Sequence, residues 1–236
     1  MRYASTLLAL AVLATLSGCT GSDTVITPAA NPANSSESED ADVPPERSPD
    51  RFAFSAVNDG IDICFRKIRE KLGNEARVKE IDSFFSAGAD VDPDDDEPKG
   101  TLTTCSVKYQ NPEDQRKLLS LQMDVHAGTF GNPVPVKLQV MGDKESFKLD
   151  DYVIELGKVD TAPLQAFMDS QKTALDKVYS AYTWDDIRLT APGAFSNKHQ
   201  LAVRLTGRYK SNDLENTGDA TLTMDGKTVL DNDLTK

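Results

Sequence analysis

The sequence predicts an α+β fold in which helices pack on an antiparallel sheet, and three observations support this prediction. Residues 55–72 and 162–182 carry apolar side chains at steps of three and four residues, the spacing of one face of a helix. Residues 101–110 and 119–125 alternate apolar and polar side chains, the spacing of a half-buried strand. Short polar turns separate the predicted strands, so neighbouring strands are expected to run antiparallel.

The first predicted helix, 55–72, carries one apolar stripe and is followed by Gly73, which can end it. The stripe consists of Ile61, Cys64, Phe65, Ile68 and Leu72. Because Cys64 belongs to this stripe, we expect its side chain to be buried. The next apolar segment, 78–87, fits a short helix and a strand equally well.

Three strands are predicted after this segment, at 101–110, 119–125 and 134–140. The apolar positions of the first strand are Cys105, Val107 and Tyr109. Cys105 is therefore expected to face the core, as Cys64 does. Turns are predicted at 111–114 and 131–133, where asparagine, proline and glycine gather.

The second predicted helix spans 162–182, with Thr161 as its cap and Pro163 in its first turn. Its apolar stripe consists of Leu164, Met168, Leu175, Val178 and Tyr182. Further strands are predicted at 184–190, 201–209, 220–224 and 227–230. The last two are joined by the turn Asp225-Gly226.

The order of these elements indicates two tandem units, 51–157 and 158–236, each with one helix and about four antiparallel strands. The stretches "SAGA" at 86–89 and "APGA" at 191–194 hold similar places in the two units. Element order carries this prediction and residue identity adds little, so a true duplication is left open. The outline resembles cystatin-like sheets wrapped round a helix, which implies that each helix lies across a curved sheet.

The N-terminus predicts export and attachment to a membrane. Arg2 precedes an apolar run, 4–16, that is shorter than the ~20 residues of a membrane-spanning helix. Leu16-Ser17-Gly18-Cys19 resembles the lipobox of bacterial lipoproteins. The resemblance implies that the signal peptide 1–18 is removed and that the Cys19 sulfur carries lipid, with acyl chains such as palmitate. An ordinary signal peptide is the alternative.

Thr20 follows the predicted lipid anchor, and lipoproteins without aspartate at that place are typically sent to the outer membrane. The resemblance therefore implies an outer-membrane lipoprotein that faces the periplasm and contacts the membrane through its anchor only. Residues 19–50 are rich in proline, serine and acidic residues and have almost no large apolar side chains. Such a segment is expected to be a disordered acidic tether.

The chain has three cysteines, and the predicted lipid on Cys19 leaves Cys64 and Cys105 as an even pair. An oxidising compartment favours a disulfide between them. A zinc site is the weaker alternative, because the two thiols lie far apart in the sequence and no histidine pair accompanies them.

Charge and motifs limit the function. The formal net charge is −12, which excludes nucleic acid as an expected partner and favours a basic protein. His126 and His199 are the only histidines, and the Gly-x-Ser-x-Gly, His-Glu-x-x-His and phosphate-loop motifs are absent from the sequence. We therefore expect a protein without catalytic residues, cofactor or metal.

An acidic stretch after the ambiguous segment 78–87 is the candidate partner-binding site. Its carboxylates are Asp90, Asp92, Asp94, Asp95, Asp96 and Glu97. Calcium binding is the alternative, but Asp95 stands where a calcium loop needs glycine, and Thr101 stands where it needs glutamate. A basic stripe, Arg204, Arg208 and Lys210, is expected to be a solvated strand face. The alternatives are that it meets an anionic ligand or pairs with nearby acidic loops.

Two functions are compatible with these features. The first is a non-catalytic periplasmic module that binds an envelope or toxin protein, and its outline resembles immunity and inhibitor lipoproteins that neutralise basic cell-wall-degrading toxins. The second is a carrier of a lipid or another apolar ligand, or a structural component of an envelope machine.

Overall fold

The computed structural model describes residues 52–139, 145–193 and 196–236, which belong to one compact unit, Arg47–Lys236. The predicted signal peptide, the anchor Cys19 and the tether lie outside the described residues. The strands are β1 (Arg77–Phe85), β2 (Leu102–Gln110), β3 (Leu118–Asp124), β4 (Thr129–Phe130), β5 (Val134–Val136), β6 (Ile154–Glu155), β7 (Tyr179–Thr190), β8 (Gln200–Tyr209), β9 (Glu215–Thr223) and β10 (Val229–Asn232). The helices are α1 (Ala56–Asp59), α2 (Ile63–Leu72) and α3 (Pro163–Val178), with short 3₁₀ turns η1 (Leu149–Tyr152) and η2 (Leu156–Lys158).

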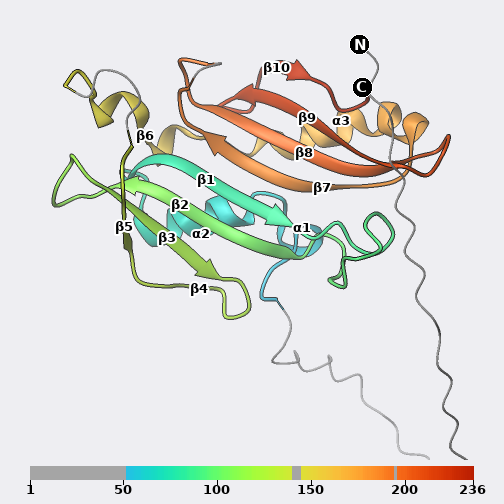
Figure 1. The fold of residues 1–236 in the computed structure, drawn as a ribbon, viewed down its shortest axis with the longest axis horizontal. Helices are drawn as coiled ribbons and strands as arrows, with labels where there is room; N and C mark the ends of the chain where they lie inside the picture. Colours follow the sequence, from blue (N-terminus) through green and yellow to red (C-terminus); the bar gives the residue numbers. More distant parts are fainter. Residues whose placement is uncertain (1–51, 140–144, 194–195) are drawn as a thin grey trace, which may run out of the picture. The chain divides into compact units, whose positions relative to one another are not determined.

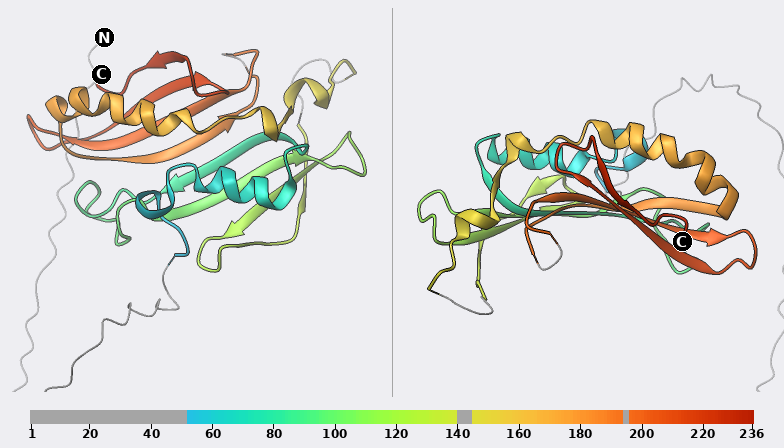
Figure 2. Two further views of the ribbon diagram at one scale, coloured as in Figure 1. Left: turned by 180° about the vertical axis from the view of Figure 1, so that it is seen from behind. Right: turned by 90° about the horizontal axis from the view of Figure 1, so that it is seen from above.

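One antiparallel sheet runs through the described part of the chain in the order β10-β9-β8-β7-β1-β2-β3-β4 (Figure 1). β5 pairs with β3, and β6 pairs with β1. The helices α2 and α3 lie on the same face of this sheet, α2 against β1 and β2 and α3 against β7 (Figure 2). The predicted α+β class, with helices on an antiparallel sheet, is confirmed.

The two halves of the sheet meet at β1 and β7. Ile81 pairs with Leu189 and Ser83 pairs with Ile187 across this seam. The order α2-β1-β2-β3-β4 on one side is matched by α3-β7-β8-β9-β10 on the other. The ambiguous segment 78–87 is therefore mostly strand, and its pairing with two neighbours decides between the two local alternatives.

The core lies between the helices and the sheet. Cys64 on α2 and Cys105 on β2 are both fully buried, with Cα atoms 5.5 Å apart, and form a disulfide. The disulfide predicted from the cysteine count is confirmed. It closes a loop with a sequence separation of 41 residues, which corresponds to about 4 kcal/mol in the chain-entropy description.

The first predicted helix, 55–72, is wrong as a single element. Gly60 has φ of +87° and donates its backbone N–H to the Ala56 carbonyl, which ends α1 after one turn. α2 then begins at Ile63. An apolar stripe cannot reveal this break, because Ile61 is buried on the same side as the stripe of α2.

The second predicted helix is four residues too long, because Tyr179 begins β7. Its ring is buried and stacks on Tyr209 of β8 with centroids 5.4 Å apart. A Cβ at Gly207 would lie 2.8 Å from the Tyr179 ring, so the glycine makes room for this packing. Tyr182 therefore lies on a strand, contrary to the sequence prediction.

Two smaller predictions are also wrong. Thr161 does not cap α3; Ala162 holds that position without a side-chain bond, while Pro163 begins the helix as expected. The strand predicted at 134–140 is limited to β5 within the described residues, which end at 139 here. Pro135 has no N–H to give to a sheet, which keeps β5 short.

None of the helices in the described residues has the length and apolar character that a membrane-spanning helix needs.

Candidate functional site

The acidic loop, residues 86–100 between β1 and β2, is braced from inside by Asp95. One Asp95 carboxylate oxygen accepts hydrogen bonds from Ser86 Oγ at 2.9 Å and from the Ala87 N–H at 2.9 Å. The other accepts from the Glu97 N–H at 3.0 Å. Burial disfavours the charge, but these bonds outweigh it and lower the pKa of Asp95 below its ordinary value. Asp95 thus points into its own loop.

The other predicted partner-binding carboxylates differ from Asp95. Asp90, Asp94 and Asp96 are exposed, while Asp92 and Glu97 are half-buried. No ion pair to lysine or arginine involves these five groups within the described residues. No three acidic, histidine or cysteine side chains of the described chain converge on a possible metal position.

The basic stripe fixes the acidic loop to the second half of the sheet. Arg208 Nε donates to the Val91 carbonyl at 2.7 Å. Arg204 Nε instead pairs with Asp219 at 3.0 Å, and Lys210 donates to the Asp176 carbonyl. The stripe therefore contacts the acidic loop at Arg208, through a backbone carbonyl of the loop and not through one of its carboxylates.

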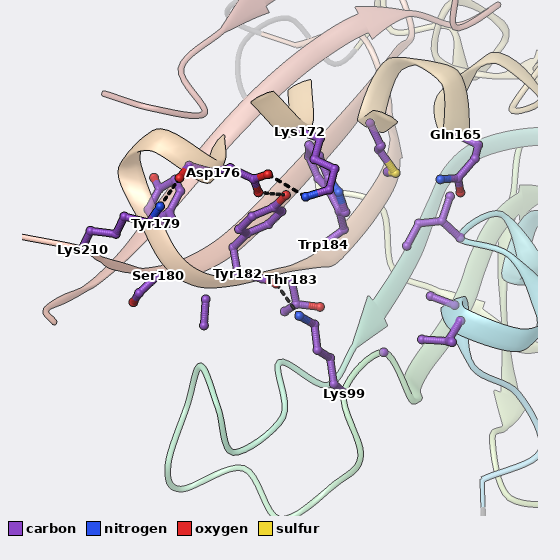
Figure 3. A pocket seen from close by; sticks show the side chains of 16 residues that line it. Lys99, Gln165, Lys172, Asp176, Tyr179, Ser180, Tyr182, Thr183, Trp184 and Lys210 are labelled. Atoms are coloured by element: carbon purple, nitrogen blue, oxygen red, sulfur yellow. Dashed lines mark hydrogen bonds and ion pairs between the residues drawn. The ribbon is translucent and has the colours of Figure 1, made fainter. Parts of the chain in front are cut away.

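A groove of about 750 Å³ lies between α1, the end of the acidic loop, α3 and the first half of β7 (Figure 3). Its ionisable side chains other than tyrosine are Lys99, Lys172, Lys210 and Asp176. We call it the lysine groove. Three cationic groups and one anionic group make its walls net positive, although the chain carries −12.

The lysines are held by the groove itself. Lys99 Nζ donates to the Tyr182 carbonyl at 2.5 Å. Lys172 Nζ lies 2.6 Å from one Asp176 oxygen, and the Tyr182 hydroxyl donates to the other at 3.1 Å. Hydrogen bonding from Lys172 lowers the pKa of Asp176. Because an ammonium has three donors, each lysine keeps N–H groups for a ligand.

The groove also has apolar lining residues. Trp184 and Met168 are among them, and the Trp184 ring centroid is 6.3 Å from that of Phe167. Val57 of α1, another lining residue, is 75% exposed. The groove therefore offers cationic and apolar contacts within one space, and Figure 3 shows Trp184 next to Lys172.

A second cluster of charge lies on the sheet face opposite the helices. Asp186 of β7 is 2% exposed, 2.9 Å from Arg188 Nε and 3.9 Å from Arg204 Nη1. Burial raises the pKa of Asp186 to about 6, although both arginines oppose the change. The three groups are ion-paired, but within the described residues neither carboxylate oxygen of Asp186 nor Arg188 Nε makes a hydrogen bond. The Asp186 charge is therefore incompletely compensated.

Neither histidine lines the lysine groove. His126 is exposed after β3 and stacks on Phe52 with ring centroids 4.3 Å apart. His199 is buried just before β8, and burial lowers its pKa.

The lysine groove has no signature in the sequence that would predict it. Lys99, Lys172 and Lys210 are widely separated in the sequence, and only the Lys172–Asp176 pair has a local signal, its helical spacing of four residues. No protein family, curated protein or solved structure matches this chain.

Proposed function

We propose that this protein is a non-catalytic binding module of the bacterial envelope, held at the outer membrane through Cys19 and docking a basic protein through its acidic loop. The observation that carries the proposal is the contrast inside that loop. Asp95 braces the backbone, while Asp90, Asp94 and Asp96 are exposed without an ion pair in the described residues. A braced loop presents these charges without a large ordering cost on binding.

The chemistry of the cysteines supports the proposed compartment. The Cys64–Cys105 disulfide suits an oxidising compartment such as the periplasm. In the sharpest form of the proposal the protein is an immunity protein or inhibitor that neutralises a basic cell-wall-degrading toxin. The carboxylates would speed the encounter with such a partner.

The finer fold proposal is that the two halves are tandem cystatin-like units, 51–157 and 158–236. The matched order of a helix and antiparallel strands on both sides of the β1–β7 seam supports it. Under this proposal the acidic loop belongs to the first unit and α3 to the second.

The direct test is capture of partners from an envelope extract by the full-length chain, followed by binding kinetics of the captured protein at low and high salt. We expect a basic partner whose association rate falls as salt rises. The triple variant Asp90→Asn, Asp94→Asn, Asp96→Asn should slow association about tenfold at low salt.

The matched control removes the same charge elsewhere. Glu75, Glu113 and Asp231 are exposed and have no ion pair within the described residues, so Glu75→Gln, Glu113→Gln, Asp231→Asn changes net charge alone. If both triple variants slow association equally, the effect comes from the net charge of the protein and not from the position of the loop carboxylates. A partner that is not basic, or binding without salt dependence, would overturn the proposal.

A carrier of an apolar ligand is the second candidate, favoured by the apolar side chains of Trp184 and Met168 in the lining of the lysine groove. Native mass spectrometry of the gently extracted protein distinguishes the two candidates. A bound lipid would support the carrier, and a clean protein mass supports the docking module.

A further inference from the structure

We propose that the lysine groove binds an extended acidic peptide segment of a partner protein, which adds as a strand to an unpaired part of β7. This site is separate from the exposed carboxylates of the acidic loop, and its ligand has the opposite charge.

The first observation is an incomplete strand pairing. β7 pairs with β8 along its whole length, from Tyr179 opposite Tyr209 to Thr190 opposite Gln200. On its other side, the register with β1 begins only at Asp186, opposite Phe84. We call residues 179–185 of β7 the open edge, because no described strand pairs with them on that side. Figure 1 shows β1 ending while β7 continues.

The second observation is that the lysine groove follows this edge. Its lining includes six consecutive residues of β7, from Tyr179 to Trp184, so backbone as well as side chains borders the space. A strand of that length extends about 20 Å. The groove therefore offers a peptide the edge of a formed sheet, which is the basis of strand addition.

The third observation is how the open edge is satisfied. The Tyr182 carbonyl, which in a complete sheet would accept an N–H from the next strand, accepts a hydrogen bond from Lys99 Nζ at 2.5 Å. A flexible lysine occupies the place of a backbone donor. An incoming strand can supply that donor and release the ammonium to contact a carboxylate of the same peptide.

Charge selects the kind of peptide. Lys99, Lys172 and Lys210 surround the open edge, and Asp176 is the single carboxylate among the lining residues. The chain as a whole is strongly acidic, but the groove is locally positive. An acidic segment is therefore attracted to the groove, and a basic segment is not. Trp184 and Met168, which line the same groove, fit one large apolar side chain next to the acidic stretch.

A lipid is a poorer match for the same space. An acyl chain has no donor for the Tyr182 carbonyl and no use for the other backbone groups of the open edge. Three ammonium groups around one edge suit a ligand with several carboxylates spaced along its length, which an acidic peptide has and a fatty acid lacks.

The test measures binding of synthetic peptides to the full-length chain by calorimetry at low salt. The probe is a capped decapeptide of alternating Glu and Val that ends in Leu-Phe, and the control peptide has Lys in place of every Glu. We expect the acidic peptide to bind at least about tenfold more tightly than the basic one. No preference for the acidic peptide overturns the proposal.

Variants locate the site. Lys99→Gln, Lys172→Gln, Lys210→Gln together should weaken binding at least about tenfold. Lys71→Gln, Lys177→Gln, Lys227→Gln removes the same charge at exposed positions outside the groove and should leave the affinity nearly unchanged. Equal losses of affinity in both lysine triple variants would overturn the assignment to the groove. The Asp90, Asp94 and Asp96 variant that tests the proposed function leaves these lysines intact, so the two proposals can fail independently.

Strand addition has its own readout. Two versions of the acidic peptide are N-methylated at odd or at even positions, so only one version loses the N–H groups that face β7. One version should bind and the other should not, and hydrogen exchange should slow in 180–184. Equal behaviour of the two versions overturns strand addition, and binding of sodium decanoate without peptide binding assigns the groove to a lipid instead.

Discussion

The two halves of the sheet are covered by the same kind of element, yet their helices are held differently. In the first half, α2 is joined to β2 by the Cys64–Cys105 disulfide. In the second half, α3 has no disulfide and is held by the packing of Leu164, Phe167, Met168 and Leu175 and by hydrogen bonds from Tyr182 and Lys210 to Asp176. One layer is fixed covalently, and the other can shift wherever its packing allows.

This difference coincides with the position of the lysine groove. Lys172, Asp176 and Met168 of α3 line the groove, whereas α2 contributes no lining residue among those described. The adaptable helix therefore borders the proposed peptide site, and the stapled helix lies away from it. A wall that can adjust suits a groove that must admit an added strand.

The largest expected effect comes from removing the disulfide. Cys64→Ala with Cys105→Ala should lower the free energy of unfolding by about 4 kcal/mol, because the unfolded chain loses a crosslink. Denaturant unfolding measures the total, and hydrogen exchange should show faster opening of α2 than of α3. If hydrogen exchange accelerates equally in α2 and α3, the disulfide stabilises both halves and not the first half alone.

The converse experiment weakens α3. Leu175 is 0% exposed, and Leu175→Ala should cost about 3 kcal/mol through lost burial and a cavity. Here hydrogen exchange should accelerate in α3 while α2 keeps its protection. Lys177→Ala on the exposed face of the same helix is the control and should change stability by less than about 0.5 kcal/mol. Loss of protection in α2 as well would mean that the halves unfold as one.

Local periodicity in the sequence predicts some features of the two halves and not others. The stripe of α2 and the alternation of β2 place Cys64 and Cys105 on facing surfaces, so the disulfide follows from two local patterns. The end of α3 does not, since Tyr182 continues the helical spacing. Its strand position depends on Gly207 and Tyr209, which are distant in sequence.

Of the two candidate binding surfaces, the acidic loop can be predicted from the sequence and the lysine groove cannot. The acidic loop is one continuous stretch, so its carboxylates are visible in the sequence, although the inward turn of Asp95 is not. The lysine groove needs the β1–β7 seam to bring Lys99 near Lys172 and Lys210. No single segment contains that information, because a non-local strand pairing creates the groove.

Asp186 at this seam should give a pH-dependent effect. Its pKa is raised from 3.8 to about 6, so the folded state binds a proton more tightly than the unfolded chain does. Its contribution to stability is therefore greatest below pH 4, falls as pH rises toward 6, and stays low above that. Asp186→Asn removes this loss.

The measurement compares unfolding free energies at pH 4 and pH 7. Stability of Asp186→Asn relative to the natural chain should rise by about 2 kcal/mol between these values, since one pKa unit corresponds to about 1.4 kcal/mol and the two arginines remain partly solvated. Asp231→Asn, at an exposed position of β10, should show no such change. A relative stability that falls with pH would have the wrong sign.

The smallest expected effect concerns the link between the two helices. Thr161, 4% exposed before α3, donates its hydroxyl to the Asp62 carboxylate before α2, with 3.2 Å between the oxygens. Thr161→Val keeps the shape but removes the donor and should cost about 1 kcal/mol, because Asp62 retains Arg66 as a partner. Thr161→Ser keeps the hydroxyl and should restore most of this loss. Since the bond joins the stapled helix to the adaptable one, the valine variant should also raise exchange at the start of α3 more than in α2. If serine and valine behave alike, the side chain contributes by packing and the two helices are coupled only through the sheet.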